Sequence, residues 1–118
     1  MVRFADMLKG PEEEGKEKHT PFLEVKTGQG PGQEKVVHVV VGKETPHPNT
    51  VEHHICWIEL YGTRQEGQVI NLGRAAFAPT YTEPNVTFHV PAPEQFKSFC
   101  AVCYCNIHGV WDNCIENG

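Results

Sequence analysis

Residues 34–41 read Glu-Lys-Val-Val-His-Val-Val-Val, a run whose content of β-branched residues is typical of a β-strand. The glycine-rich segment 28–32 precedes this run, and a loop containing Pro46 and Pro48 follows it. Six other stretches of the chain show the same alternation of a short apolar run with turn-forming residues. The predicted strands are 22–26, 34–41, 54–61, 69–78, 86–90, 98–104 and 110–114.

The spacing of these stretches predicts the fold class. Turn-forming residues separate the strands at 62–64, 79–81 and 91–93, and helical periodicity is absent apart from one turn at 93–96. Seven short strands in about one hundred residues are typical of an all-β, immunoglobulin-like seven-stranded β-sandwich. We therefore expect a flexible N-terminal lead-in at 1–16 and a single β-sandwich domain at 17–118.

Composition excludes several classes of partner. The formal net charge is −5, which disfavours nucleic acid and anionic membrane surfaces. No apolar run approaches the length of a transmembrane span, and the first residues do not read as a signal peptide. The five cysteines are an odd number, which predicts reduced thiols and a cytoplasmic location.

Residues with metal-binding chemistry gather in three short segments. They are His19 in Glu-Lys-His-Thr-Pro, His47 and His53 in Pro-His-Pro-Asn-Thr-Val-Glu-His-His-Ile, and Cys105 and His108 in Cys-Asn-Ile-His-Gly. A nitrogen-rich set with a single soft sulfur suits iron or copper better than structural zinc, which usually takes two or more cysteines. Blue-copper sites usually add a methionine, and both methionines of this chain lie in its first seven residues. The set predicts a redox-metal centre, with iron favoured.

The remaining histidines and cysteines are expected to have structural roles. Neighbouring side chains of an extended segment point to opposite faces, so only one of His53 and His54 can enter the site. His38 and His89 are expected to be strand residues rather than ligands. Cys100 and Cys103 should point to opposite faces of one strand. We expect small buried thiols at positions 56, 100 and 103 and an exposed, oxidation-prone thiol at position 114.

Five segments together resemble the superoxide reductase family in its single-iron, neelaredoxin form. They are residues 17–21, 41–44, 46–55, 57–61 and 105–111, and their order and spacing fit the family over most of the chain. The resemblance implies one mononuclear iron per chain. Its ligands would be His19, His47, His53 and His108 in the equatorial plane and Cys105 as the axial thiolate.

The same resemblance implies roles for two neighbours of the first histidine. Glu17 would bind only the oxidised iron, at the position opposite the sulfur. Lys18 would provide a positive field that attracts superoxide, and it would help to orient a proton-donating water. His53 would be the ligand in preference to His54.

The reaction implied by the resemblance is O2⁻ + e⁻ + 2H⁺ → H2O2, without release of O2. A small protein such as rubredoxin would supply the electron, and the chain would form a homo-oligomer, either a dimer or a tetramer. Two other classes remain open. A cupredoxin-like electron-transfer protein would hold copper and would not react with superoxide, whereas a structural zinc domain would be colourless and would unfold without its metal.

Overall fold

The computed structural model describes residues 1–13, 18–28 and 34–118. Over these ranges nearly all the regular structure is β, and none of the helices is long and apolar enough to cross a bilayer. The elements in chain order are α1 (Phe4–Met7), η1 (Pro11–Glu13), β1 (Phe22–Thr27), β2 (Lys35–Val40), β3 (Ile55–Arg64), β4 (Val69–Ala76), β5 (Asn85–Val90), η2 (Pro93–Gln95), β6 (Phe96–Cys105) and β7 (Gly109–Glu116).

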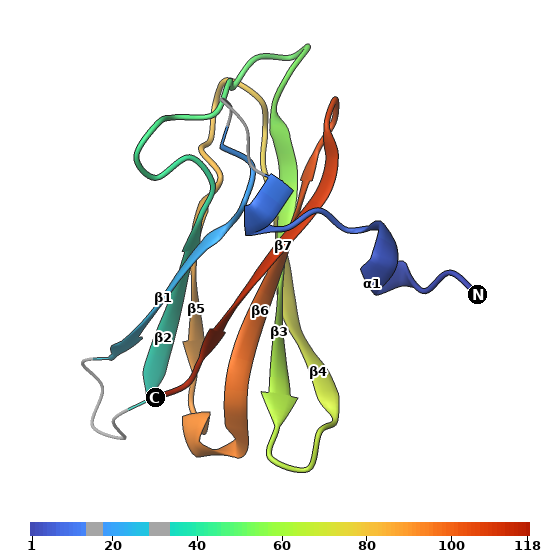
Figure 1. The fold of residues 1–118 in the computed structure, drawn as a ribbon. Helices are drawn as coiled ribbons and strands as arrows, with labels where there is room; N and C mark the ends of the chain where they lie inside the picture. The colour runs from blue at the N-terminus through green and yellow to red at the C-terminus, as the bar shows by residue number, and fades with distance from the viewer. Residues whose placement is uncertain (14–17, 29–33) are drawn as a thin grey trace.

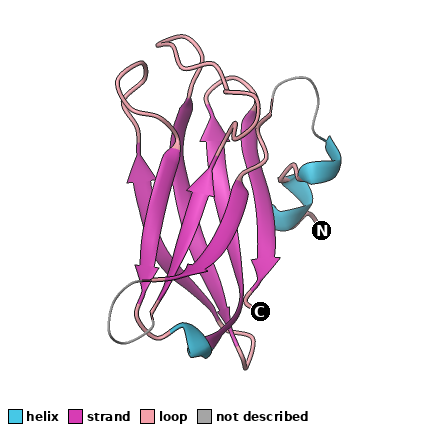
Figure 2. Ribbon diagram, turned by 90° about the vertical axis from the view of Figure 1, so that its left-hand side faces the viewer, coloured by secondary structure: helices cyan, strands magenta, loops and turns pink. Residues whose placement is uncertain are grey.

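The seven strands form two antiparallel sheets packed face to face (Figures 1 and 2). One sheet has the order β1-β2-β5 and the other the order β4-β3-β6-β7. Strand β4 pairs with β3 rather than with β5, which gives the three-plus-four division of strands. The predicted all-β, immunoglobulin-like seven-stranded sandwich is therefore confirmed.

Alternating burial along the strands builds the core between the sheets. On β2 the inward residues Val37 and Val39 are fully buried, and on β6 the inward residues Phe99, Ala101 and Cys103 are fully buried. The residues between them are more exposed, as expected when successive side chains point to opposite faces. Burying one large aliphatic or aromatic side chain contributes about 1.5–3 kcal/mol, so this core holds the sheets together.

All seven predicted strands are present, but the predicted turn at 62–64 is wrong. Strand β3 continues to Arg64, and the chain turns between Arg64 and Gln68. Gly62 is needed for a close approach rather than for a turn, because a Cβ atom there would lie 2.6 Å from Cδ1 of Phe96. The one helical turn predicted at 93–96 is confirmed as the 3-10 helix η2.

The N-terminal segment lies along the edge strand β7. The backbone of Lys9 exchanges two hydrogen bonds with this strand, with N–O distances of 3.2 and 2.8 Å, and its ammonium lies 5.5 Å from the ring centroid of Trp111. The predicted boundary at residue 16 lies outside the described residues and stays a prediction.

The expectation that all the cysteines are reduced is wrong for two of them. Cys100 and Cys114 form a disulfide, with their Cα atoms 4.0 Å apart. They stand directly opposite each other on β6 and β7, a pairing that depends on a register that cysteine spacing alone does not reveal. Cys114 is exposed, and Cys103 is fully buried on the opposite face of β6 from Cys100, as predicted. Cys56 is a half-buried thiol rather than a buried one.

Candidate metal centre

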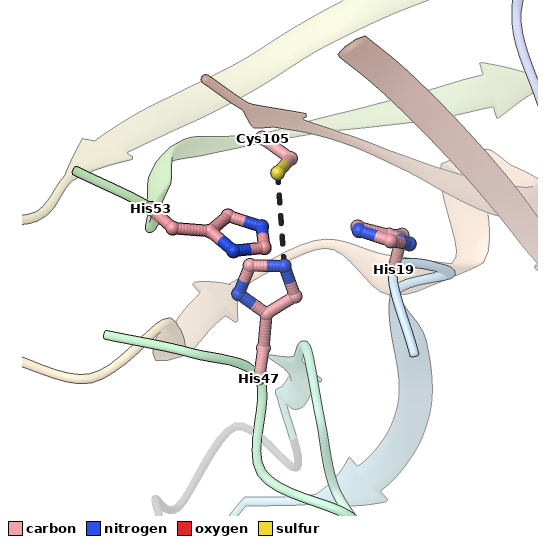
Figure 3. A group of neighbouring side chains, drawn as sticks. All are labelled: His19, His47, His53 and Cys105. Atoms are coloured by element: carbon pink, nitrogen blue, oxygen red, sulfur yellow. Dashed lines mark hydrogen bonds between the residues drawn. The ribbon is translucent and has the colours of Figure 1, made fainter. Parts of the chain in front are cut away.

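The five predicted ligands lie on segments that meet at one end of the sandwich (Figure 1), and four of them are drawn in Figure 3. His19 lies just before β1, and His47 and His53 lie on the connection from β2 to β3. Cys105 is the last residue of β6, and His108 lies in the turn to β7. The fold therefore brings together residues from three separate parts of the chain.

Four of these side chains form a compact donor cluster. One ligand atom each from His19, His47, His53 and Cys105 lies within 4.8 Å of the others. In Figure 3 the three imidazoles surround the space below the sulfur atom. His19, His47 and Cys105 are buried, with exposed fractions of 5%, 7% and 0%, and His53 is half-buried. A set of buried polar donors converging on one point is typical of a metal site.

His108 completes the predicted set at the solvent side. Its Nδ1 atom lies 3.1 Å from Nε2 of His19 and 3.8 Å from Sγ of Cys105. Its ring centroid is 4.8 Å from that of His19 and 5.1 Å from that of His53. Although the residue as a whole is exposed, its Nδ1 atom faces the cluster, so Nδ1 is the atom with which it would bind a metal.

The local backbone fixes the tautomer of His47. Its Nδ1 atom lies 2.8 Å from the carbonyl oxygen of Pro48, and a carbonyl can only accept, so Nδ1–H donates. The lone pair is then on Nε2, which lies 3.6 Å from Sγ of Cys105. Gly42 permits the loop to pass this closely, because its φ is +81° and a Cβ atom there would lie 2.5 Å from the backbone nitrogen of His47.

The tight turn after β6 directs a backbone donor at the sulfur of Cys105. The backbone N–H of His108 points at this sulfur with an N–S distance of 3.4 Å, a contact that stabilises a thiolate. A second thiol lies nearby, and burial together with the charge of Cys105 raises the pKa of Cys56 above its ordinary value of 9.0. Of these two thiols, Cys105 is the one that belongs to the donor cluster.

Asn106 joins the turn to the segment that carries His53, a role that sequence reasoning missed. Its Oδ1 accepts from the backbone N–H of His54 at 2.9 Å, and its Nδ2 donates to the carbonyl of Glu52 at 3.0 Å. Its own backbone N–H donates to the carbonyl of His54 at 3.2 Å. The only signal in the sequence is a polar residue placed between two predicted ligands.

Trp111 and Cys103 hold the first histidine in place, and sequence reasoning did not assign either role. The ring of Trp111 stacks on that of His19, with a centroid separation of 4.7 Å and an interplanar angle of 16°. The same indole N–H donates to the carbonyl of His108 at 3.2 Å. The thiol of Cys103 donates to the carbonyl of His19 at 3.1 Å. Cys103 of β6 and Trp111 of β7 face each other across the two strands, and both contact His19 of the cluster.

Three other histidines stay outside the cluster, as predicted. His54 turns away, with its Nδ1 atom 3.0 Å from the carbonyl of Thr50 and its Nε2 atom 3.6 Å from Sγ of Cys56. His38 is half-buried on β2, and His89 is exposed on β5. The structure therefore brings His53 rather than His54 into the cluster.

Glu17 and Lys18 precede His19 in the sequence, and the structure describes only Lys18. Lys18 is exposed, and together with Lys43 it lines a cavity of about 240 Å³. Glu17 lies outside the described residues, so its predicted role is not tested by the structure.

The donor set fits iron. Four imidazoles and one thiolate leave too few sulfurs for a typical structural zinc site, and a mixed nitrogen and sulfur shell suits a first-row redox metal. Both methionines are exposed on the N-terminal segment, so no thioether reaches the cluster as a blue-copper site would usually require.

Comparisons with known proteins find similar sequences and structures over most of the chain. A family model described as Desulfoferrodoxin matches residues 11–114. The superoxide reductase of Pyrococcus abyssi is 44% identical over 115 residues, which cover 94% of this chain and 96% of the relative. The neelaredoxin of Megalodesulfovibrio gigas is 33% identical over 111 residues, which cover 82% of this chain and 84% of the relative. A solved structure of a superoxide reductase in the oxidized state matches with a TM-score of 0.81 and 35% identity, covering 97% of this chain and 98% of the other.

Proposed function

This chain belongs to the desulfoferrodoxin family, and from that premise we propose which of its residues carry out the reduction of superoxide. The reaction consumes one electron and two protons and yields hydrogen peroxide without release of O2. The proposed ligands of one iron ion per chain are His19, His47, His53, His108 and Cys105. The observation that supports this proposal most directly is the convergence of four of their donor atoms within 4.8 Å.

The ligand residues have separable tasks. When bound, iron would supply the single electron and, with one thiolate and neutral imidazoles around it, a site of net positive charge that favours an anionic substrate. His47 presents the lone pair of Nε2 because its Nδ1–H donates to the carbonyl of Pro48. Cys105 is buried completely, which excludes water from its sulfur and protects the thiol from oxidation.

Lys18 is proposed to steer superoxide to the site and to help orient a proton-donating water. It is exposed and precedes the predicted ligand His19 directly, so it places a positive charge next to the proposed site in a protein whose net charge is −5. A local positive field can raise the association rate of an anion by roughly 10–10³-fold, and the effect falls with ionic strength.

Glu17 is proposed to bind the iron only in its oxidised state, as the family resemblance implies. Glu17→Ala should then change the visible spectrum of the oxidised protein and leave the reaction with superoxide nearly intact. A large loss in the rate of the first step would contradict this role.

We also propose three features of the cellular setting. A small redox protein such as rubredoxin would supply the electron. The described residues contain one group of side chains that could hold a metal, so we expect no second redox metal in this part of the chain. The chain would assemble as a homo-oligomer, either a dimer or a tetramer. It would work in the cytoplasm, where reducing conditions keep Cys105 available as a thiolate.

The test of this function is the visible spectrum of iron-loaded protein before and after chemical oxidation. Oxidation should produce a broad absorption band from the iron–thiolate bond, and Cys105→Ser should abolish it. Cys56→Ser is the matched control, since this half-buried cysteine of β3 lies outside the donor cluster and should be dispensable for the band. If the oxidised parent stays colourless with full iron occupancy, Cys105 is not a ligand and the proposed function fails.

A further inference from the structure

The disulfide between Cys100 and Cys114 has no part in the reaction described above. It lies on the outer face of the four-stranded sheet, where Cys114 is exposed and Cys100 is half-buried. Strand β7 is the edge strand of this sheet. Of the two cysteines, Cys114 is therefore the more accessible to a thiolate from solution, and Cys100 is partly shielded.

This disulfide joins the two strands of the hairpin that carries two of the proposed ligands, Cys105 at the end of β6 and His108 in the turn. The register of β6 and β7 pairs Cys100 with Cys114, then Cys103 with Trp111, and finally Cys105 with Gly109. The middle pair is the one that contacts His19 through a thiol hydrogen bond and a ring stack. The bond thus closes the same hairpin that supports the metal cluster.

We propose that Cys100 and Cys114 form a reversible redox site, which a dithiol reductant opens and hydrogen peroxide closes. The inference draws on the proposed function only for the natural source of the peroxide. Its chemistry follows from an exposed cysteine, a partly shielded partner and a sheet that keeps the two opposed.

Opening proceeds by thiol–disulfide exchange. A thiolate of the dithiol attacks Sγ of the exposed Cys114, the bond to Cys100 breaks, and Cys100 leaves as a thiolate that takes up a proton. The second thiol of the reductant then attacks the mixed disulfide and releases Cys114. The reductant becomes an intramolecular disulfide, and the protein gains two electrons and two protons as two thiols.

Closing uses one molecule of hydrogen peroxide. The thiolate of Cys114 attacks one oxygen, the O–O bond breaks, and the products are a sulfenic acid and hydroxide. The thiol of Cys100 then displaces water from the sulfenic acid, and the disulfide is restored. The net change is H2O2 + 2 Cys–SH giving 2 H2O and one disulfide.

The surrounding sheet favours this closing step. Cys100 is paired on its other side with Tyr61 of β3, so β6 is held within the sheet, and the hairpin hydrogen bonds keep β7 in register after the sulfur bond opens. The resolving thiol therefore remains beside the sulfenic acid, which favours an intramolecular reaction over further oxidation.

The proposal is tested on folded, iron-loaded protein with dithiothreitol and with added hydrogen peroxide. Thiols are alkylated after denaturation and located by mass spectrometry. Cleavage after Lys97 and before Asp112 separates Cys114 from Cys100, and fragment ions then distinguish Cys100 from the two other cysteines of its peptide. We expect label at both positions to rise from almost none to nearly complete after dithiothreitol, and to fall again after one equivalent of peroxide.

Two results would overturn the proposal. One is label that appears only when the protein is denatured before reduction, which would show a bond closed to reductants. The other is label that persists at both positions after peroxide treatment. Cys100→Ser provides a second measurement, since a sulfenic-acid probe should then trap Cys114, whereas Cys56→Ser should leave the cycle of the parent unchanged. Because peroxide is added directly, failure here is distinct from failure of the superoxide reaction.

Discussion

Replacing Trp111 with phenylalanine should weaken both the fold and the hold on the metal cluster. The indole is almost fully buried, with an exposed fraction of 4%, and it makes two contacts that a phenyl ring cannot fully reproduce. Its N–H donates to the carbonyl of His108 at 3.2 Å, and its ring stacks on His19.

The expected loss can be estimated from these contacts. Removing the donor to a part-buried carbonyl costs about 1 kcal/mol. A phenyl ring buries roughly 40 Å² less surface than an indole, which adds about 1 kcal/mol. We therefore expect Trp111→Phe to lower the free energy of unfolding by about 2 kcal/mol, or roughly 30-fold in the unfolding equilibrium constant.

The assay is urea denaturation of the metal-free protein, followed by iron release to a chelator from the loaded protein. Trp57→Phe is the matched control, because the only other tryptophan is half-buried on β3, where its ring contacts Tyr104 and Arg74. The control should lose less than about 1 kcal/mol and should keep the parent's release rate. If the two variants unfold alike and release iron at the same rate, Trp111 does not support the site.

Three further predictions concern the surroundings of the cluster. Lys18→Ala should slow the reaction with superoxide by roughly tenfold at low salt and flatten the dependence of its rate on ionic strength. Stopped-flow kinetics would measure both effects. Lys97→Ala, which removes an exposed lysine of β6, should react like the parent. Asn106→Ala should lower the free energy of unfolding by about 2 kcal/mol, since two side-chain hydrogen bonds are lost, and an unchanged urea midpoint would refute this. The pKa of Asp112 is raised above 3.8 by burial and by the nearby Glu12 and Glu13, so its ionised form costs stability at neutral pH. Asp112→Asn should therefore melt at a higher temperature than the parent at pH 7, and the difference should shrink as the pH falls towards 3.8 and the parent carboxylate becomes protonated.

The sequence predicted the strands well because their signal is local. A run such as Val36 to Val41 carries its own β-propensity, and the turn residues around it mark where it ends. The error at Gly62 arose because a glycine that serves a close contact with Phe96 looks the same in sequence as a glycine that serves a turn. Only the packing of β3 against the start of β6 separates the two cases.

The ligand candidates were predictable because their residue types are unusual, whereas their supports were not. Short segments that contain histidine and cysteine predict a metal site. The choice of His53 over His54 came from the family resemblance rather than from the residue pattern. Trp111 and Cys103 act through a cross-strand pair, and that pair exists only in one register of β6 and β7. The same register produces the Cys100–Cys114 disulfide, so one missing fact explains both omissions.

The distribution of the cluster along the chain has a consequence for the order of folding. His19 and His108 are 89 residues apart, and His47 and Cys105 are 58 residues apart. Contacts of such high sequence separation form late, because the intervening loops must close first. An unfolded chain therefore offers no preassembled site, and we expect iron to bind after the sheets have paired. A bound ion would then act as a cross-link between distant segments and would slow unfolding rather than speed folding.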